Sequence, residues 1–383
     1  MSKKKELEIY IHIPFCVRKC QYCDFLSGPA DEGTKTRYME ALCQEIMGKS
    51  SKYAEYKVTS IFFGGGTPTA VDAKALCRVL SLVKERFDIQ SEAEITIEMN
   101  PGTVTKESLS LYKNAGINRV SLGLQSTNDA ELLRLGRIHT YEQFLETYKQ
   151  VREAGFTNVN IDLMSALPGQ DMESYKESLT RVIKLTPPPE HISAYSLIVE
   201  EGTPFYEAYE LGQLDLPAED VEREMYHLTR FYLKEQGYER YEISNYAQPG
   251  RECIHNIGYW RRKNYVGFGI GAASLVENRR FSNGEDMQKY LKNPCECEIN
   301  CQILTIEEQM EEYLFLGLRM CRGVSAKAFE ECFGRTLEQV YGPIIQKHMN
   351  NGLLEQNGEW LRLTEAGMDV SNYVMADFLE PNI

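Results

Sequence analysis

Three cysteines near the start of the sequence have a spacing that suits a metal cluster. Residues 15–26 read FCVRKCQYCDFL, which places Cys16, Cys20 and Cys23 in a CxxxCxxC pattern. Thiolates select zinc or iron–sulfur clusters. A structural zinc site needs four protein ligands, and the sequence offers no second CxxC or HxxxH pair to complete one. Three cysteines on a [4Fe-4S] cluster leave one iron open to an exchangeable ligand, so the pattern favours that cluster.

A repeat of short apolar runs and longer helical patterns must position this triplet. Between residue 8 and about residue 200, six runs alternate with helical segments: EIYIHIPF, TSIFFGGG, EITIEMNP, RVSLGLQS, NVNIDLMSALPG and HISAYSLIV. Such a repeat predicts a parallel sheet that is buried on both faces, either as an open doubly wound sheet or as a barrel of the TIM type. Polar residues and glycines follow nearly every run, and this favours a barrel or partial barrel, because barrel enzymes assemble their sites there.

The second half of the chain is less regular. Residues 293–301, NPCECEINC, are typical of a linker, and the segment beyond them shows helical patterns followed by a hairpin that turns at Asn357-Gly358. Helices followed by a hairpin indicate a winged-helix-like module. We therefore expect an α/β core over residues 1–300 and a small helical domain over residues 301–383.

Composition and charge exclude several classes of protein. An apolar content of 43% supports globular cores, and no run of about 18 apolar residues exists that could span a bilayer. The start of the chain has no apolar stretch of signal-peptide length. We therefore expect a cytoplasmic protein. In a reducing compartment, the odd number of 11 cysteines is better explained by metal ligands or core thiols than by disulfides. The net charge of -14 argues against a nucleic-acid partner.

The cysteine triplet and the glycine-rich segment FFGGGTPT resemble the radical S-adenosylmethionine superfamily. In that superfamily the amino and carboxylate groups of the cofactor's methionine moiety chelate the open iron. The resemblance implies a [4Fe-4S] cluster on Cys16, Cys20 and Cys23, with S-adenosylmethionine as the second cofactor. It also implies a cofactor site formed by Tyr10, Tyr22, Gly65, Gly66, Thr67, Glu98, Gln125, Arg137 and Asp162.

Further segments resemble the coproporphyrinogen III oxidase-like family, which holds an oxygen-independent oxidase and a related heme chaperone. These segments are YIHIPFC, NIDLMSALPGQ and SAYSLIVEEGTPFY. Phe25 stands where the oxidase type has a fourth cysteine, HNIGYW at 255–260 matches the HNxxYW heme-binding motif of the chaperone type, and the oxidase's N-terminal extension is missing. The resemblance implies a chaperone that binds heme and hands it to an acceptor apoprotein, for example a membrane respiratory protein.

The residue types in the HNxxYW segment suit heme. The imidazole of His255 can bind iron, Tyr259 and Trp260 offer flat apolar surface, and the cations at 261–263 can pair with the two propionates. Cys253 is an alternative anchor. We expect a carrier rather than an enzyme, while a radical oxidase of coproporphyrinogen III and a methyltransferase-like enzyme of another tetrapyrrole stay open as alternatives. Whether the chain forms a homodimer is also open.

Overall fold

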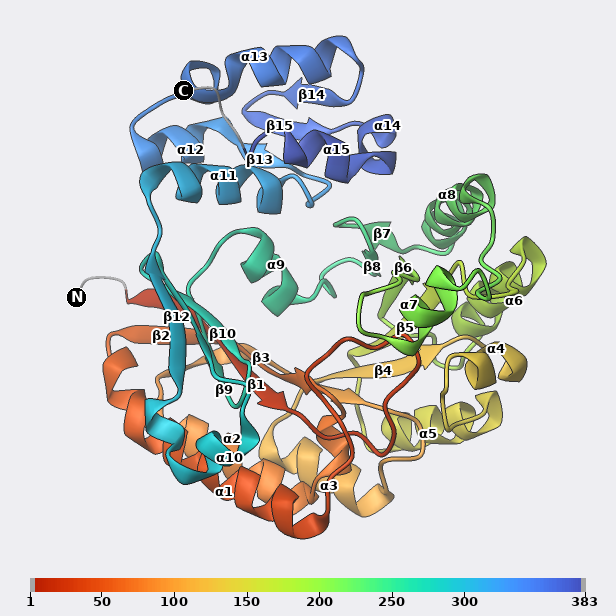
Figure 1. Ribbon diagram of the computed structural model, residues 1–383, viewed down its shortest axis with the longest axis vertical. Helices are drawn as coiled ribbons and strands as arrows, with labels where there is room; N and C mark the ends of the chain where they lie inside the picture. The colour runs from red at the N-terminus through yellow and green to blue at the C-terminus, as the bar shows by residue number, and fades with distance from the viewer. Residues whose placement is uncertain (1–3, 380–383) are drawn as a thin grey trace.

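The computed structural model describes residues 4–379, which contain a 12-stranded sheet and a three-stranded sheet (Figure 1). In the large sheet the strands follow the order β12-β11-β10-β9-β1-β2-β3-β4-β5-β6-β8-β7. Its centre consists of six parallel strands: β1 (Lys5–Ile13), β2 (Tyr56–Gly65), β3 (Ile89–Met99), β4 (Arg119–Gln125), β5 (Val159–Ser165) and β6 (His191–Ser196). These strands coincide with the six apolar runs, so the predicted α/β class with repeated βα units is confirmed.

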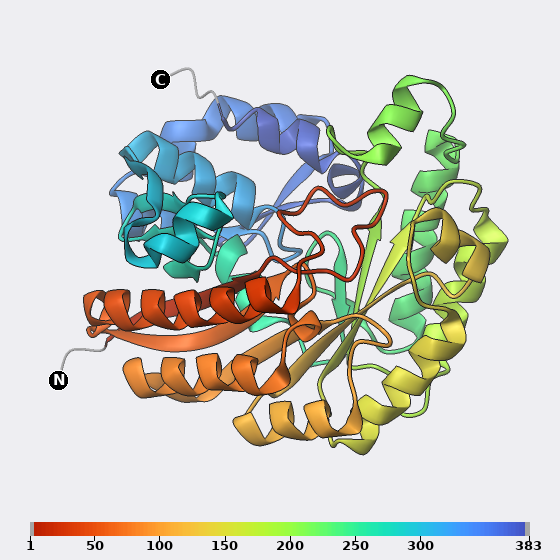
Figure 2. The same ribbon diagram turned by 60° about the horizontal axis from the view of Figure 1, so that its bottom comes forward.

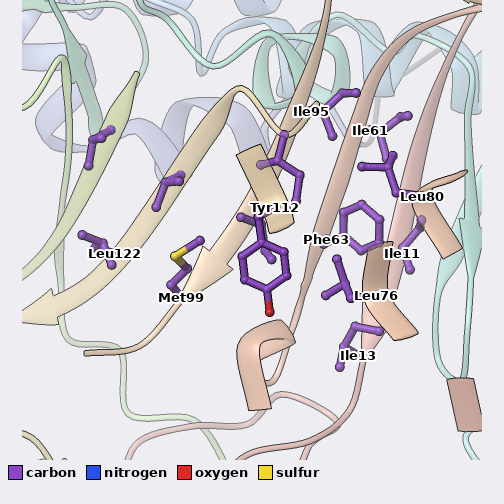
Figure 3. Close-up of a cluster of buried hydrophobic side chains, with 14 of the residues drawn as sticks. Ile11, Ile13, Ile61, Phe63, Leu76, Leu80, Ile95, Met99, Tyr112 and Leu122 are labelled. Carbon is purple, nitrogen blue, oxygen red and sulfur yellow. The ribbon is translucent and has the colours of Figure 1, made fainter. Parts of the chain in front are cut away.

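Helices follow the central strands and cover their outer face (Figure 2). They are α1 (Glu32–Lys49), η1 (Ser50–Tyr53), η2 (Pro68–Ala70), α2 (Ala73–Arg86), α3 (Lys106–Ala115), α4 (Asp129–Arg134), α5 (Tyr141–Glu153) and α6 (Met172–Ile183). Helix α2 shows why they form. Asp72 caps its first turn by accepting a hydrogen bond from Ala75 N. Its apolar residues recur at helical spacing, and Leu76 and Leu80 pack against Ile11 and Phe63 of the sheet (Figure 3).

The segment between the central strands and the C-terminal module adds strands on both sides of the sheet. Its elements are α7 (Pro204–Glu210), α8 (Glu219–Glu235), β7 (Glu239–Arg240), β8 (Asn245–Ala247), α9 (Ile254–Trp260), β9 (Tyr265–Phe268), β10 (Ala273–Val276), β11 (Arg279–Asn283), α10 (Met287–Lys292), η3 (Pro294–Glu296) and β12 (Glu298–Ile303). β9 pairs with β1 in parallel, and β8 pairs antiparallel with β6. Helix α9 lies between the central strands and the C-terminal module (Figure 1).

The expectation of a linker at residues 293–301 is wrong. These residues form η3 and most of β12, which pairs with β11 at the edge of the sheet. Glu298 is held by Arg279 at 2.8 Å, and Cys297 Sγ lies 3.5 Å from Nζ of the buried Lys49. The acidic segment is therefore ordered by cations from distant parts of the chain.

The C-terminal residues form a helical module with its own apolar cluster. It contains α11 (Ile306–Gly317), β13 (Val324–Ser325), α12 (Ala326–Phe333), α13 (Leu337–Asn350), β14 (Leu354–Asn357), β15 (Trp360–Leu363), α14 (Glu365–Asp369) and α15 (Ser371–Ala376). The expected hairpin is β14–β15. The predicted domain division at residue 300 stays a prediction: β12 crosses it, and residues 1–3 and 380–383 lie outside the described residues. Between residues 4 and 379, no helix combines the length and the apolar character that a membrane span requires.

Candidate functional site

The cysteine triplet lies on the loop that joins β1 to α1, across the ends of the central strands (Figure 2). The base of this loop is closed by two backbone hydrogen bonds, from Cys16 N to Gly28 O and from Gly28 N to Pro14 O, both of 3.0 Å. Its middle is tied to two other segments, because Gln21 N donates to Leu135 O and Gln21 O accepts from Phe205 N. The loop is thus fixed by backbone contacts that do not depend on the cysteine side chains.

The three cysteines line one cavity of about 530 Å³, which is within the usual size range of ligand pockets. All three are partly exposed and free. Within residues 4–379 no three His, Cys, Asp or Glu side chains are arranged to hold a single metal ion. A cubic cluster takes each thiolate on a different iron, so its ligands need not meet at one point.

Polar groups near the cysteine sulfurs support thiolates at this position. Thr67 Oγ1 lies 3.6 Å from Cys16 Sγ, and Arg137 Nη1 lies 3.7 Å from Cys20 Sγ. Burial raises the pKa of the Cys23 thiol, so a bound cation must overcome this effect to keep a thiolate there. Arg137 is itself held by Asn100 Oδ1 at 2.7 Å and by Gly123 O at 2.6 Å.

The glycine segment after β2 passes close to the cysteine loop. A Cβ atom on Gly66 would lie 2.7 Å from Phe15 O and 3.0 Å from Cys16 Sγ. Gly65 adopts a φ of 109°, which L side chains rarely adopt, and its N–H donates to Glu98 Oε2 at 3.2 Å. Only residues without a side chain allow the backbone to run this close to the cysteines.

Two half-buried carboxyl groups, those of Glu98 and Asp162, form the polar wall of the cavity. Burial, together with the nearby Asp162, raises the pKa of Glu98 to about 8. Burial also raises the pKa of Asp162, whose oxygens accept hydrogen bonds from Asn160 Nδ2 at 2.7 Å and Ser121 Oγ at 3.3 Å. A cationic or hydroxyl-rich ligand would favour the charged form of both groups, so this wall suits an ammonium group and ribose hydroxyls.

The structure brings most of the predicted site residues together. The cavity is lined by Cys16, Cys20, Cys23, Tyr22, Gly65, Gly66, Thr67, Glu98, Gln125, Arg137 and Asp162. Tyr10 is not among the lining residues. Its hydroxyl lies 3.0 Å from His12 Nδ1, and His12 Nε2 lies 2.9 Å from Leu26 O on the cysteine loop. Tyr10 therefore contacts the cysteine loop indirectly, through His12. Its predicted contact with the cofactor stays a prediction.

His255 does not reach the cavity. It is 1% exposed, its Nδ1 lies 2.8 Å from Ser60 Oγ, and its Nε2 lies 3.0 Å from Tyr259 OH. Burial, together with Arg119, lowers the pKa of His255 to about 3 and keeps the ring neutral. Both ring nitrogens have partners, so neither is available to iron in this conformation. The role of His255 as a heme ligand stays a prediction, while the next residue, Asn256, lines the cavity.

Two of the three cations after the motif are also engaged within the chain. Arg262 pairs with Glu312 of α11 at 2.8 Å, and Lys263 pairs with Glu6 of β1 at 2.7 Å. In the described structure these two side chains join neighbouring elements, and they would have to leave their partners to meet heme propionates.

Sequence reasoning missed the polar interior that holds α9. Glu94, on β3, accepts hydrogen bonds from Ile254 N at 3.1 Å and His255 N at 3.2 Å. A chain of hydrogen bonds also reaches α9: Asn160 contacts His191, and His191 contacts the hydroxyl of Tyr241. This hydroxyl accepts a hydrogen bond from Cys253 N at 3.3 Å. The signal for Glu94 was present, because in EITIEM the polar residues alternate and point to one face of the strand.

A cysteine triplet after the first strand of a parallel βα sheet, beside a glycine turn and half-buried carboxyls, defines a radical S-adenosylmethionine protein. The sequence model of the Radical SAM superfamily matches residues 10–182, and that of the HemN C-terminal domain matches residues 304–370. The cofactors are therefore a [4Fe-4S] cluster and S-adenosylmethionine.

Comparison with whole proteins shows which family of radical S-adenosylmethionine proteins the chain belongs to. The chain is 37% identical to the heme chaperone HemW of Lactococcus lactis, over 99% of both chains. It is 36% identical to that of Bacillus subtilis, over 97% of this chain and 98% of the relative, and 32% identical to that of Escherichia coli, over 99% and 100%. The chain belongs to the HemW family of heme chaperones.

A solved structure shares the fold. Coproporphyrinogen III oxidase (HemN) from Escherichia coli, a radical SAM enzyme, matches with a TM-score of 0.85 at 22% identity. The match covers 98% of this chain and 90% of the oxidase. The predicted fold class, with its radical SAM core and C-terminal helical domain, is confirmed.

Proposed function

We propose that the protein is a heme chaperone, which binds heme and transfers it to an acceptor apoprotein. The observation that carries this proposal is identity of 30 to 37% to heme chaperones over almost the entire chain. Phe25 supports it, because the oxidase type has a cysteine at this position of the cysteine loop. The acceptor is proposed to be a heme protein such as a membrane respiratory protein. Eleven free cysteines suit the reducing cytosol, where we place the chaperone.

We propose that Cys16, Cys20 and Cys23 hold the cluster. S-adenosylmethionine is proposed to lie along the lining residues Tyr22, Gly65, Gly66, Thr67, Glu98, Gln125, Arg137 and Asp162, with Tyr10 supporting the loop. When bound, the cluster would supply an open iron, which the amino and carboxylate groups of S-adenosylmethionine would chelate. Glu98 and Asp162 accept hydrogen bonds from the cofactor, and Gly66 keeps the backbone close to Cys16. His255 is proposed as a heme ligand for a conformation in which its ring has left Ser60 and Tyr259.

Two domains are also proposed, a radical SAM core over residues 1–300 and a C-terminal domain over residues 301–383. Separate apolar clusters support this division. The C-terminal cluster is built from residues between Met310 and Phe378. Limited proteolysis should therefore release a core fragment that ends close to residue 303, where β12 ends.

The second candidate function is oxidative decarboxylation of coproporphyrinogen III. The similarity of fold to the oxidase favours it. The test is a heme titration of the reconstituted protein, run beside an anaerobic assay with coproporphyrinogen III, reductant and S-adenosylmethionine. We expect stoichiometric heme binding and no protoporphyrinogen IX. Turnover of coproporphyrinogen by the unmodified protein, without heme binding, would replace the chaperone by the oxidase.

The cluster ligands are tested separately. Cys20→Ala should remove most of the iron and sulfide from the reconstituted protein, and its circular dichroism should stay unchanged, because the loop carries no core side chain at this position. Cys77→Ala, in α2 and away from the cavity, is the matched control and should keep a full cluster. A full iron and sulfide content in Cys20→Ala would show that the cluster is held elsewhere.

A further inference from the structure

Four large apolar side chains stand exposed around the mouth of the cavity. They are Val17, Phe25, Ile138 and Ile198, which we call the rim, and their exposed fractions are 60%, 62%, 53% and 67%. All four also line the cavity. Single exposed apolar residues are ordinary on a protein surface, but four that gather at one cavity mouth mark a binding surface.

The rim comes from three segments that are far apart in the sequence. Val17 and Phe25 belong to the cysteine loop, Ile138 to the connection between α4 and α5, and Ile198 to the chain after β6. The bonds of Gln21 to Leu135 and Phe205 hold these three segments together. The surface is therefore formed before any ligand arrives, which lowers the entropic cost of binding.

Two cations lie beside the rim. Arg18 and Lys19 are exposed, line the cavity and make no ion pair with any residue in the range 4–379. Asp24 and Glu200 also line the cavity, so the mouth as a whole is not basic. The positive charge is confined to two adjacent side chains between Cys16 and Cys20. In a chain of net charge -14, this pair suits a ligand that carries anionic groups on one edge only.

The lining changes from polar to apolar between the inner part of the cavity and its mouth. Gln125 is buried and Glu98 and Asp162 are half-buried at the strand ends, whereas the four rim side chains are open to solvent. The polar part suits S-adenosylmethionine. The rim suits a second ligand with an apolar surface.

We infer that the rim is the docking site of the heme macrocycle, with its two propionates directed to Arg18 and Lys19. This inference rests on the proposed function, because it names the place where a heme chaperone would hold its heme. Heme has a flat apolar ring and both of its carboxylates on one edge, which matches the rim and the cation pair. Of the alternative cations at 261–263, Arg262 and Lys263 already have carboxylate partners, and the exposed Arg261 does not line the cavity.

The first test removes the apolar surface. Iron protoporphyrin IX is titrated into the reconstituted wild type and into Phe25→Ala/Ile198→Ala, and binding is followed by the heme absorption spectrum. The dissociation constant should rise by about tenfold or more in the variant, because two apolar contacts are lost. Cluster content and S-adenosylmethionine binding should stay at wild-type values, since both side chains are exposed and their removal leaves the core intact.

The second test addresses the charges. In Arg18→Glu/Lys19→Glu, heme should bind about tenfold more weakly or worse. The dimethyl ester of the same porphyrin, which lacks the propionate charges, should bind wild type and variant alike. The matched control is Lys74→Glu/Lys176→Glu, which makes the same change of net charge on the outer helices α2 and α6 and should bind heme as the wild type does.

The outcomes separate this inference from the proposed function. If the wild type binds no heme, the proposed function fails. If the wild type binds heme, and Phe25→Ala/Ile198→Ala and Arg18→Glu/Lys19→Glu bind it equally well, only the docking site is wrong. A charge variant that binds heme normally but accepts electrons from a reductase more slowly would assign Arg18 and Lys19 to an acidic electron donor and overturn the inference. Weaker heme binding in both the rim variant and the charge variant supports it.

Discussion

Replacement of Glu94 by Gln should destabilise the protein strongly, because one buried carboxylate holds both α9 and a buried arginine. Glu94 is 5% exposed, and its two oxygens accept from Ile254 N, His255 N and Cys253 Sγ. Arg119 is 2% exposed, and its Nε lies 3.9 Å from Glu94 Oε2. Gln has almost the same shape, but it removes the charge and turns one acceptor into a donor that faces backbone N–H groups.

The expected loss of unfolding free energy follows from the charge of Arg119, which stays buried without its partner. Removal of one partner of a buried ion pair costs about 3–5 kcal/mol, because the other charge stays buried without compensation. At about 2.1 cal/mol/K per residue, 383 residues give an unfolding entropy of roughly 0.8 kcal/mol/K, so the melting temperature should fall by about 4–6 °C.

The assay is thermal unfolding followed by circular dichroism at neutral pH. Glu92→Gln is the matched control, because Glu92 lies on the same strand, is exposed and loses the same charge; its melting temperature should match that of the wild type. A Glu94→Gln variant that melts within about 1 °C of the wild type would refute the reasoning, since the carboxylate charge would then contribute nothing to the position of α9.

Two further predictions concern β1 and the glycine segment. Burial raises the pKa of Glu8 from 4.5 to about 9, so the folded protein keeps a proton that the unfolded chain has lost, and stability falls as the pH rises between these values. Relative to Glu8→Gln, the wild type should lose on the order of 1 kcal/mol of unfolding free energy per pH unit in urea titrations between about pH 6 and about pH 8; parallel curves would contradict this. Gly66→Ala should lower cluster content, measured as iron and sulfide, because the new Cβ would lie 2.7 Å from Phe15 O. Gly28→Ala, on the same loop but with open space around it, should keep the cluster; equal cluster content in the two variants would show that the glycine is not required.

The sequence predicted the parts of the site that lie at strand ends. Glu98, Gln125 and Asp162 come from three different strands, yet all line one cavity, because the carboxyl ends of parallel strands converge on one edge of the sheet. The parallel topology of the sheet therefore places polar residues from separate strand ends in one cavity. No knowledge of distant contacts was needed for these residues.

Features that depend on distant partners escaped prediction. The polar composition of residues 293–301 indicates a linker, but Arg279 and Lys49 turn the segment into an edge strand. His255 is buried against Ser60, which is 195 residues away in the sequence. Neither partner leaves a signal in the segment itself, so local pattern could not distinguish an accessible imidazole from a buried one.

The packing of α9 shows why the HNxxYW segment need not present its side chains to a ligand. A Cβ atom on Gly258 would overlap the Glu8 carboxyl, so the helix lies directly against β1. On the other side of the helix, the guanidinium of Arg319 lies 4.4 Å from the Trp260 ring centre. The helix is thus a joint between the central sheet and the C-terminal module. If His255 does bind heme iron, its release from Ser60 and Tyr259 must disturb this joint, and heme binding would then loosen the C-terminal module. If heme rests only on the rim, the joint stays closed, and hydrogen exchange of α9 and α11 should be the same with and without heme.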